Sequence, residues 1–374
     1  MLNKTISFAL VAMFMCTNLY SQYENSFFDN DKYEDTIDSS HILLHFDNLS
    51  YFRNCEYLSP VDKGSTYIGF NLLPYAQYSF NDKAQIYGGL LIRYDFGNPE
   101  LKLLEPYFKF TYNDVLKHNI VFGNLNGTLQ HRMIEPLYDY ERAVTDRFEQ
   151  GLQISKPGDV IEYDAWIDWH DMIYENDPKN ERFVAGYNLY LNPVNTERNK
   201  LSLNAQGITV HSAGEIDLNS APNSVEYNFA YGLEYTHFFN EETNLFLAGH
   251  AAFYEDRSNT LVNGLIDGVG QLGVIRLTHK EYQFVLNYWD SHQYQGPWGE
   301  QLYHSLGNKN WPSPQDYRKM IGARVGYEVT IGKNLVFLNR LGFNYNVHPN
   351  KLDVTMENYL RWHFTGNKKK VNLN

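Results

Sequence analysis

Apolar and polar residues alternate along most of the chain. In one row, Val225, Tyr227 and Phe229 are separated by residues that are polar or small, and the row continues to Tyr235. Similar rows run through residues 161–170 and 321–331. A period of two residues is the pattern of a β-strand with two different faces. It predicts about sixteen strands: 41–53, 65–80, 84–96, 101–112, 118–126, 150–155, 160–170, 182–192, 200–211, 225–239, 243–255, 265–278, 281–291, 317–331, 334–346 and 352–364.

The connections between these strands differ in length in a regular way. Those after every second strand are short: 81–83, 113–117, 156–159, 193–199, 240–242, 279–280 and 332–333. The others include long segments, of which 127–149 and 292–316 are the longest, although those after the third and fifteenth strands are short. Short turns at one end and long loops at the other are typical of a transmembrane antiparallel up-and-down β-barrel. We therefore expect an all-β fold of this kind.

The first residues indicate export. Lys4 precedes a short apolar run, 6–15, and residues 19–21 form a plausible cleavage site, so we expect a cleaved signal peptide over 1–21. No other stretch is long and apolar enough for a transmembrane helix. We expect a flexible extension over 22–40, with a small plug as the alternative, then the barrel over 41–364 and a basic tail over 365–374.

Composition changes this picture little. Aromatic residues make up 16% of the chain, which suits a barrel with aromatic girdles. A soluble periplasmic sandwich or jelly roll is the alternative. A net charge of -13 argues against nucleic acid as a partner.

The last strand, 352–364, is rich in aromatic residues on one face, including Trp362 and Phe364. Together with the signal peptide, the alternation and the turn lengths, it resembles a Gram-negative outer-membrane porin-type barrel, over about residues 41–364. The resemblance implies an outer-membrane location, contact with the lipid bilayer, recognition of 352–364 by the barrel insertion machinery, and a monomer or homotrimer. In general porins the third external loop narrows the pore, and here 127–149 occupies that position.

The segment 127–149 carries many charges. As a constriction loop it would place acidic groups opposite basic wall residues and create a field across the pore. Alternatives are an external lid or a surface helix over 137–150. The candidate constriction residues are Arg132, Glu135, Asp139, Glu141, Arg142, Asp146 and Arg147.

Charged residues in the inward rows of the strands are candidate lumen-lining residues. They either line a solute path or form paired structural networks. These residues are Arg93, Lys109, Glu162, Asp164, Asp168, His170, Arg276, Arg324, Arg340 and Arg361.

A rim-site hydrolase is a third hypothesis, because Asp168, His170 and Asp171 are expected near the external rim and acid–base groups of this kind can activate water. His211 and Ser212 are adjacent and point to opposite faces of a strand, which argues against a dyad there. We expect no metal site, no cofactor and no enzyme. The main hypothesis is a channel for passive or weakly selective diffusion of small polar solutes, and the second is a non-transporting barrel whose outer loops bind a surface glycan or a partner protein.

Overall fold

The computed structural model describes residues 26–28, 41–213, 222–307, 316–366 and 369–370. The expected signal peptide, 1–21, lies outside these residues. Strands account for most of the described chain: β1 His41–Glu56, β2 Ser65–Ser79, β3 Ala84–Asp95, β4 Leu103–Asn113, β5 Asn119–Asn124, β6 Gln150–Lys156, β7 Ile161–Asp171, β8 Glu181–Asn195, β9 Asn199–Ala213, β10 Ser224–Asn240, β11 Thr243–Asp256, β12 Asp267–His279, β13 Tyr282–His292, β14 Tyr317–Ile331, β15 Leu335–Asn346, β16 Lys351–Thr365 and the short β17 Lys369–Lys370.

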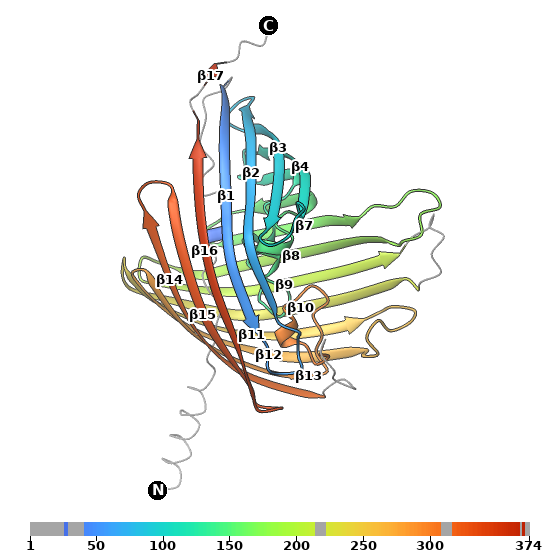
Figure 1. Ribbon diagram of the computed structural model, residues 1–374. Helices are drawn as coiled ribbons and strands as arrows, with labels where there is room; N and C mark the ends of the chain where they lie inside the picture. Colours follow the sequence, from blue (N-terminus) through green and yellow to red (C-terminus); the bar gives the residue numbers. More distant parts are fainter. Residues whose placement is uncertain (1–25, 29–40, 214–221, 308–315, 367–368, 371–374) are drawn as a thin grey trace.

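Strands β1 to β16 form a closed antiparallel barrel (Figure 1). Each strand pairs with its neighbours in the chain, and β16 pairs with β1 over twelve residue pairs to close the ring. The short β17 adds to β1 at His41 and Ile42. The predicted fold class and number of wall strands are confirmed.

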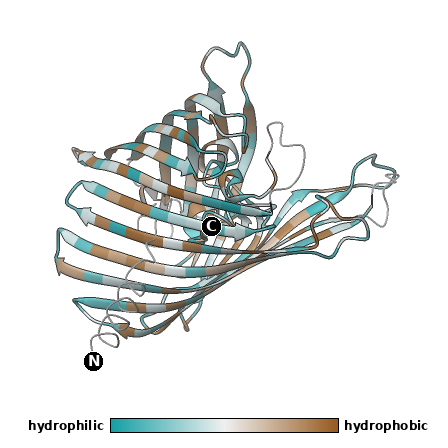
Figure 2. Ribbon diagram, turned by 90° about the horizontal axis from the view of Figure 1, so that it is seen from below, coloured by the Kyte–Doolittle hydropathy of each residue, from teal (hydrophilic) through white to brown (hydrophobic). Residues whose placement is uncertain are grey.

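The alternation along each strand separates an outer face from a lumen face (Figure 2). On β1, Leu44 and Phe46 are 56% and 42% exposed, whereas His45 and Asp47, which alternate with them, are buried. A soluble sheet would bury the apolar row, so this inverted pattern is that of a wall that faces lipid.

The two ends of the barrel differ as the sequence indicated. The connections after β2, β4, β6, β8, β10, β12 and β14 have two to five residues, and the opposite end carries 125–149 and 293–316. In barrels of this class the short turns face the periplasm. Within the described part of the chain, no helix has the length and apolarity to cross a membrane.

The shortest strands of the barrel wall are β5 and β6, which have six and seven residues. Gly123, near the end of β5, has a φ of 99°, a conformation that favours glycine. The side chain of Asn124 then accepts a hydrogen bond from the backbone N–H of Phe108 (2.7 Å), in place of a ladder bond. The segment 125–149, which we call the insert, leaves the wall at this point.

The insert lies inside the ring of strands (Figure 1). Within it, only η3 (Thr128–His131) and α2 (Arg142–Thr145) are helical, so a continuous helix over 137–150 does not form. Its apolar residues pack with those of the loop that follows β13 and carries η4 (Gln301–Tyr303). The lumen is therefore filled in large part by protein.

A third segment also lies in the lumen. The short η1 (Ser26–Phe28) places Phe27 in an apolar cluster with Leu49 and Tyr359. Arg361 donates a hydrogen bond to the carbonyl oxygen of Phe27 (2.8 Å). These residues belong to the region expected to be a flexible extension, and the rest of 22–40 lies outside the described residues.

Candidate functional site

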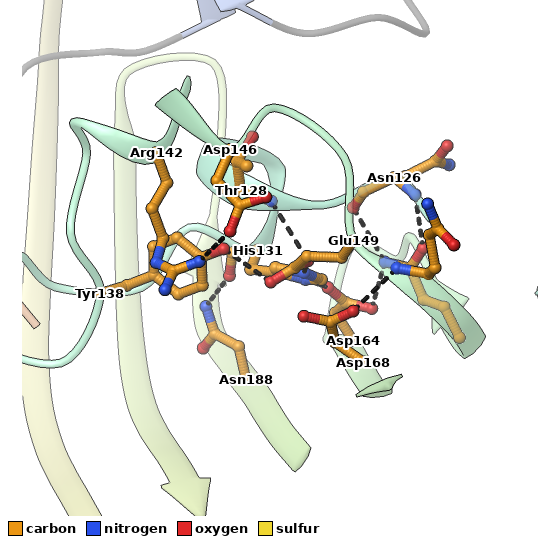
Figure 3. A network of polar contacts seen from close by, with 12 residues as sticks. Asn126, Thr128, His131, Tyr138, Arg142, Asp146, Glu149, Asp164, Asp168 and Asn188 are labelled. Carbon is orange, nitrogen blue, oxygen red and sulfur yellow. Dashed lines mark hydrogen bonds and ion pairs between the residues drawn. The ribbon is translucent and has the colours of Figure 1, made fainter. Parts of the chain in front are cut away.

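A buried histidine of the insert is held between two carboxylates (Figure 3). His131 Nε2 lies 2.5 Å from Glu149 Oε2, and His131 Nδ1 lies 2.5 Å from Asp164 Oδ2 on β7. Glu149 also accepts hydrogen bonds from the Tyr138 hydroxyl (2.6 Å) and the Thr128 N–H (3.3 Å). Asp164 Oδ1 accepts one from Gln153 (2.8 Å).

The two carboxylates set the charge of the imidazole. Burial disfavours the charged imidazolium, but the attraction of Glu149 and Asp164 outweighs this and raises the pKa of His131 to about 10. The pKa of Glu149 is lowered, because the charge of His131 outweighs the burial of the carboxylate. Near neutral pH the buried imidazole of His131 is therefore protonated.

The wall positions the histidine ring. Trp166 of β7 stacks on His131, with ring centroids 3.5 Å apart and an interplanar angle of 9°. Asn188 of β8 donates a hydrogen bond to the carbonyl oxygen of His131 (2.8 Å). A Cβ added at Gly186 would lie 2.3 Å from the Trp166 ring, so glycine leaves the space that the indole occupies.

A cavity of about 610 Å³ opens beside this site. It is lined by the short turns after β4 and β6, and therefore lies at the short-turn end of the lumen. Its size is within the range of small-molecule sites in proteins. Its lining residues are Asn113, Asp114, Lys117, Asn119, Asn126, Gln130, His131, Arg132, Gln153, Ser155, Lys156, Pro157, Glu162, Tyr163, Asp164, Asn188 and Tyr190.

Carboxylates of the insert pair directly with arginines of the wall. Glu135 forms an ion pair with Arg324 of β14, with Nη2 2.7 Å from Oε2, and also accepts a hydrogen bond from Tyr303. Glu141 pairs with Arg53 of β1. The constriction hypothesis places acidic residues of the insert opposite basic residues of the wall, across the pore. In the structure these residues are opposite each other but in direct contact.

A second contact between insert and wall has the charges reversed, with the basic residue on the insert and the acidic residue on the wall. Arg147 of the insert forms an ion pair with Asp47 of β1, and Arg361 of β16 binds the same carboxylate, with Nη2 3.0 Å from Oδ2. All three side chains are buried.

The remaining constriction candidates take separate positions. Arg132 forms an ion pair with Glu162 (2.5 Å) and lies over the ring of Tyr190 (4.3 Å). Arg142 pairs with Asp146 (2.6 Å) and lies 3.5 Å from the Trp298 ring centroid. The carboxylate of Asp139 accepts a hydrogen bond from the Glu141 N–H (2.8 Å).

The other lumen-lining candidates are mostly buried against neighbours. Arg93 binds Asp95 (3.0 Å) and the carbonyl oxygen of Thr145 (2.8 Å). Lys109, Arg276 and Arg340 lie over the rings of Tyr87, Phe246 and Phe28, respectively.

The rim residues do not form an acid–base pair with each other in the described structure. The Asp168 carboxylate is buried and accepts a hydrogen bond from the Gln150 N–H (2.8 Å). His170 is exposed, and its ring lies edge-on to Trp298, with centroids 5.3 Å apart. Among the residues that the structure describes, no group of three or more His, Cys, Asp or Glu side chains is placed to hold a metal ion.

The fold places the chain among outer-membrane β-barrels. It resembles solved porin structures, which at these identities shows the fold alone. Pseudomonas aeruginosa OprD has 8% identity over 87% of this chain and 94% of its own, with a TM-score of 0.51. The trimer form of OmpT from Vibrio cholerae has 8% identity over 87% and 100%, with a TM-score of 0.51. Salmonella typhi OmpF in complex with daunomycin has 12% identity over 87% and 98%, with a TM-score of 0.50.

Within this class, the chain belongs to the lipid A 3'-O-deacylase-type family, whose model matches residues 30–369. No curated protein matches the chain. The family is named for an enzyme activity, so the expectation that the chain is not an enzyme is wrong. That expectation weighed Asp168, His170 and the pair His211–Ser212, and it overlooked His131, which meets Asp164 only when the insert folds into the lumen.

Proposed function

We propose that this protein is an outer-membrane ester hydrolase that removes an acyl chain from a lipid A-type glycolipid. The match of residues 30–369 to the family carries the proposal. The buried His131 site supports it, because among the described residues it places a histidine and a carboxylate at the wall of a cavity large enough for a sugar headgroup.

The proposed base is Asp164. Its side chain is 15% exposed and lines the cavity, whereas both ring nitrogens of His131 are engaged by carboxylates. His131 and Gln153 hold Asp164 in place, so one carboxylate edge remains for a water molecule. A general base must lie within hydrogen-bond reach of the proton it removes.

In this reaction Asp164 takes a proton from water while the water oxygen bonds to the ester carbonyl carbon. The ester C–O bond then breaks while Asp164 returns that proton to the leaving sugar oxygen, which regenerates the carboxylate. The products are a free fatty acid and a sugar hydroxyl. Arg132 lines the cavity, and its proposed role is to stabilise negative charge on the carbonyl oxygen.

The test is hydrolysis of lipid A by the purified full-length barrel in detergent, followed by mass spectrometry of the products. Asp164→Asn and His131→Gln should lower the rate at least about a hundredfold, as expected for loss of a general base and its positioning residue. Asp168→Asn and His170→Ala at the rim are the matched controls and should retain activity. Loss of activity only in the rim variants would move the site to the rim, and a wild-type protein that releases no fatty acid would overturn the function.

A second candidate function is slow passage of small polar solutes, with the insert as the constriction. The observation in its favour is a gap of about 50 Å³ between insert and wall, with Arg53, Arg324 and Arg340 among its lining residues and Glu135, Glu300 and Glu357 also present. Rows of opposite charge across a narrow gap select solutes by charge.

Single-channel conductance in a planar bilayer tests this second function. Deletion of 128–148 should raise the conductance, and an unchanged value would contradict a constriction at the insert. The homotrimer and the recognition of 352–364 by the insertion machinery remain predictions.

A further inference from the structure

The insert is joined inside the lumen to the loop that follows β13. We call the described part of that loop, residues 293–307, the η4 loop. The backbone N–H of Asp139 donates a hydrogen bond to the carbonyl oxygen of Trp298 (2.8 Å), and that of Glu300 donates one to the carbonyl oxygen of Glu135 (2.9 Å). Apolar residues of both segments share one buried cluster. The insert and the η4 loop are therefore docked against each other.

Two carboxyl groups meet at this junction without a cation between them. The side chains of Asp139 and Glu300 form a hydrogen bond with each other. Within the part of the chain that the structure describes, neither carboxyl forms an ion pair, and Arg53 beside them is held by Glu141 and Glu357. Two ionised carboxylates cannot share a hydrogen bond, because neither carries a donor. The docked pair therefore holds at least one proton.

The surroundings place that proton on Glu300. Asp139 accepts a hydrogen bond from the Glu141 N–H (2.8 Å), so its carboxylate acts as the acceptor and takes the Glu300 hydroxyl as a second donor. Burial raises the pKa of Glu300 well above 4.5, and the negative charge of Asp139 adds to this effect. Burial and the charge of Glu141 also raise the pKa of Asp139.

The charges around the pair are balanced without it. The charged groups that face the junction from the insert and from the wall are Arg53, Glu135, Glu141, Arg324, Arg340 and Glu357. The remaining titratable groups that face Glu300 are Cys55, Tyr57 and Tyr303, which carry no charge at neutral pH. Three arginines thus meet three carboxylates, and ionisation of both members of the pair adds negative charge that no further cation offsets.

We propose that the carboxyl pair of Asp139 and Glu300 is a proton-dependent latch that holds the insert against the η4 loop. With the proton in place, Glu300 donates to Asp139 and the two segments stay docked. Loss of the proton leaves two buried carboxylates side by side, and their burial and mutual repulsion favour separation of the insert from the loop. The latch depends neither on the hydrolase nor on the channel proposed above.

The direction of the pH effect follows from the linkage between proton binding and docking. The pKa of Glu300 is raised in the docked state and returns toward 4.5 when the carboxyl reaches water. The contribution of the proton to docking is therefore fully present below pH 4.5 and is lost as the pH rises through the raised value. Between these two values the equilibrium constant for docking falls by up to about tenfold for each pH unit.

Cys55 of β1 can report the opening of the latch. Its side chain is 2% exposed and packs in the apolar cluster that the insert and the η4 loop share. The experiment measures the rate at which methyl methanethiosulfonate modifies Cys55 in the full-length barrel in detergent, between about pH 6 and pH 9. Cys55→Ser gives the background of the reagent.

Glu300→Gln is the reference variant, because its amide still donates to Asp139 but has no proton to lose. A thiol becomes more reactive as the pH rises in every variant, so each rate is divided by the rate of Glu300→Gln at the same pH. This ratio should rise at least about tenfold for the wild type over this range. A ratio that stays constant would overturn the latch.

Two further variants test the assignment to this pair. Glu226 is a buried carboxyl of β10 that accepts a hydrogen bond from Tyr254 (2.9 Å), and Glu226→Gln should keep the rise of the wild type. In Asp139→Asn, ionisation of Glu300 no longer places two like charges together, so the rise in the rate of Cys55 modification between the two pH values should be smaller than in the wild type. This second comparison does not require Glu300→Gln to fold. An undiminished rise in Asp139→Asn, or a loss of the rise in Glu226→Gln, would contradict a latch at Asp139 and Glu300.

Discussion

The ion pair between Glu135 and Arg324 gives the sharpest test of how the insert is held. The Glu135 and Arg324 side chains are 2% and 11% exposed, and Tyr303 donates a further hydrogen bond to the same carboxylate. Glu135→Gln keeps the shape of the side chain but removes the negative charge that pairs with Arg324. Removal of one partner of a buried ion pair costs about 3–5 kcal/mol. We therefore expect the free energy of unfolding to fall by about this amount.

The assay is urea unfolding of the barrel in detergent, followed by tryptophan fluorescence. Glu255→Gln is the control, because Glu255 and its partner Arg257 are 39% and 67% exposed, and exposed pairs contribute at most about 1 kcal/mol. Addition of Arg324→Met to Glu135→Gln should restore part of the loss, since the buried arginine charge that faced Glu135 is then gone. A cost for Glu135→Gln no larger than that of the control would refute the view that this pair anchors the insert.

Three further predictions follow from the lumen. Because the pKa of His131 is raised to about 10, its charge stabilises the fold fully below about pH 6.5, and this contribution is lost as the pH rises toward 10. The free energy of unfolding in urea should therefore be lower at pH 10 than at pH 6, and His131→Gln should lack this part of the decrease. Gly186→Ala should displace Trp166 and cost about 1–3 kcal/mol, whereas Gly88→Ala, where an added Cβ meets nothing within 4 Å, should be nearly neutral in the same assay. Phe27→Ala should release its segment from the lumen and speed limited proteolysis near residue 27, with unchanged cleavage arguing that the segment is held by other contacts.

The wall of the barrel was accessible from the sequence because its signal is local. Residues two positions apart share a face, so the row through Val225 and Tyr235 could be recognised without knowledge of its neighbours. The lengths of the connections also indicated which end of the barrel carries the short turns and which carries the long loops. The strands and the connection lengths both agree with the structure. The sequence also singled out Glu135 and Arg324, which form an ion pair in the structure, while their role in a pore stays a prediction.

The site was not accessible in the same way, because its contacts join distant positions. His131 meets Asp164 across 33 residues, and Glu135 meets Arg324 across 189. Periodicity does not report how an irregular segment folds back into a lumen, so neither the histidine between two carboxylates nor the filling of the lumen was predicted. The only signal in the sequence was a histidine within a charged insert. Such a histidine has no fixed spacing to its partners, so the sequence did not indicate which carboxylates it would contact.

The pairing of Asp47 with two arginines bears on how the barrel assembles. Asp47 lies on β1 and Arg361 on β16, 314 positions apart in the chain, and Arg147 of the insert reaches the same carboxylate. This cluster of three charged residues spans the seam between β1 and β16. It can therefore be complete only after β1 and β16 have paired. Contacts of such long sequence separation form slowly. We therefore expect the insert to complete these contacts late and, once in place, to oppose separation of β1 from β16 toward the lipid.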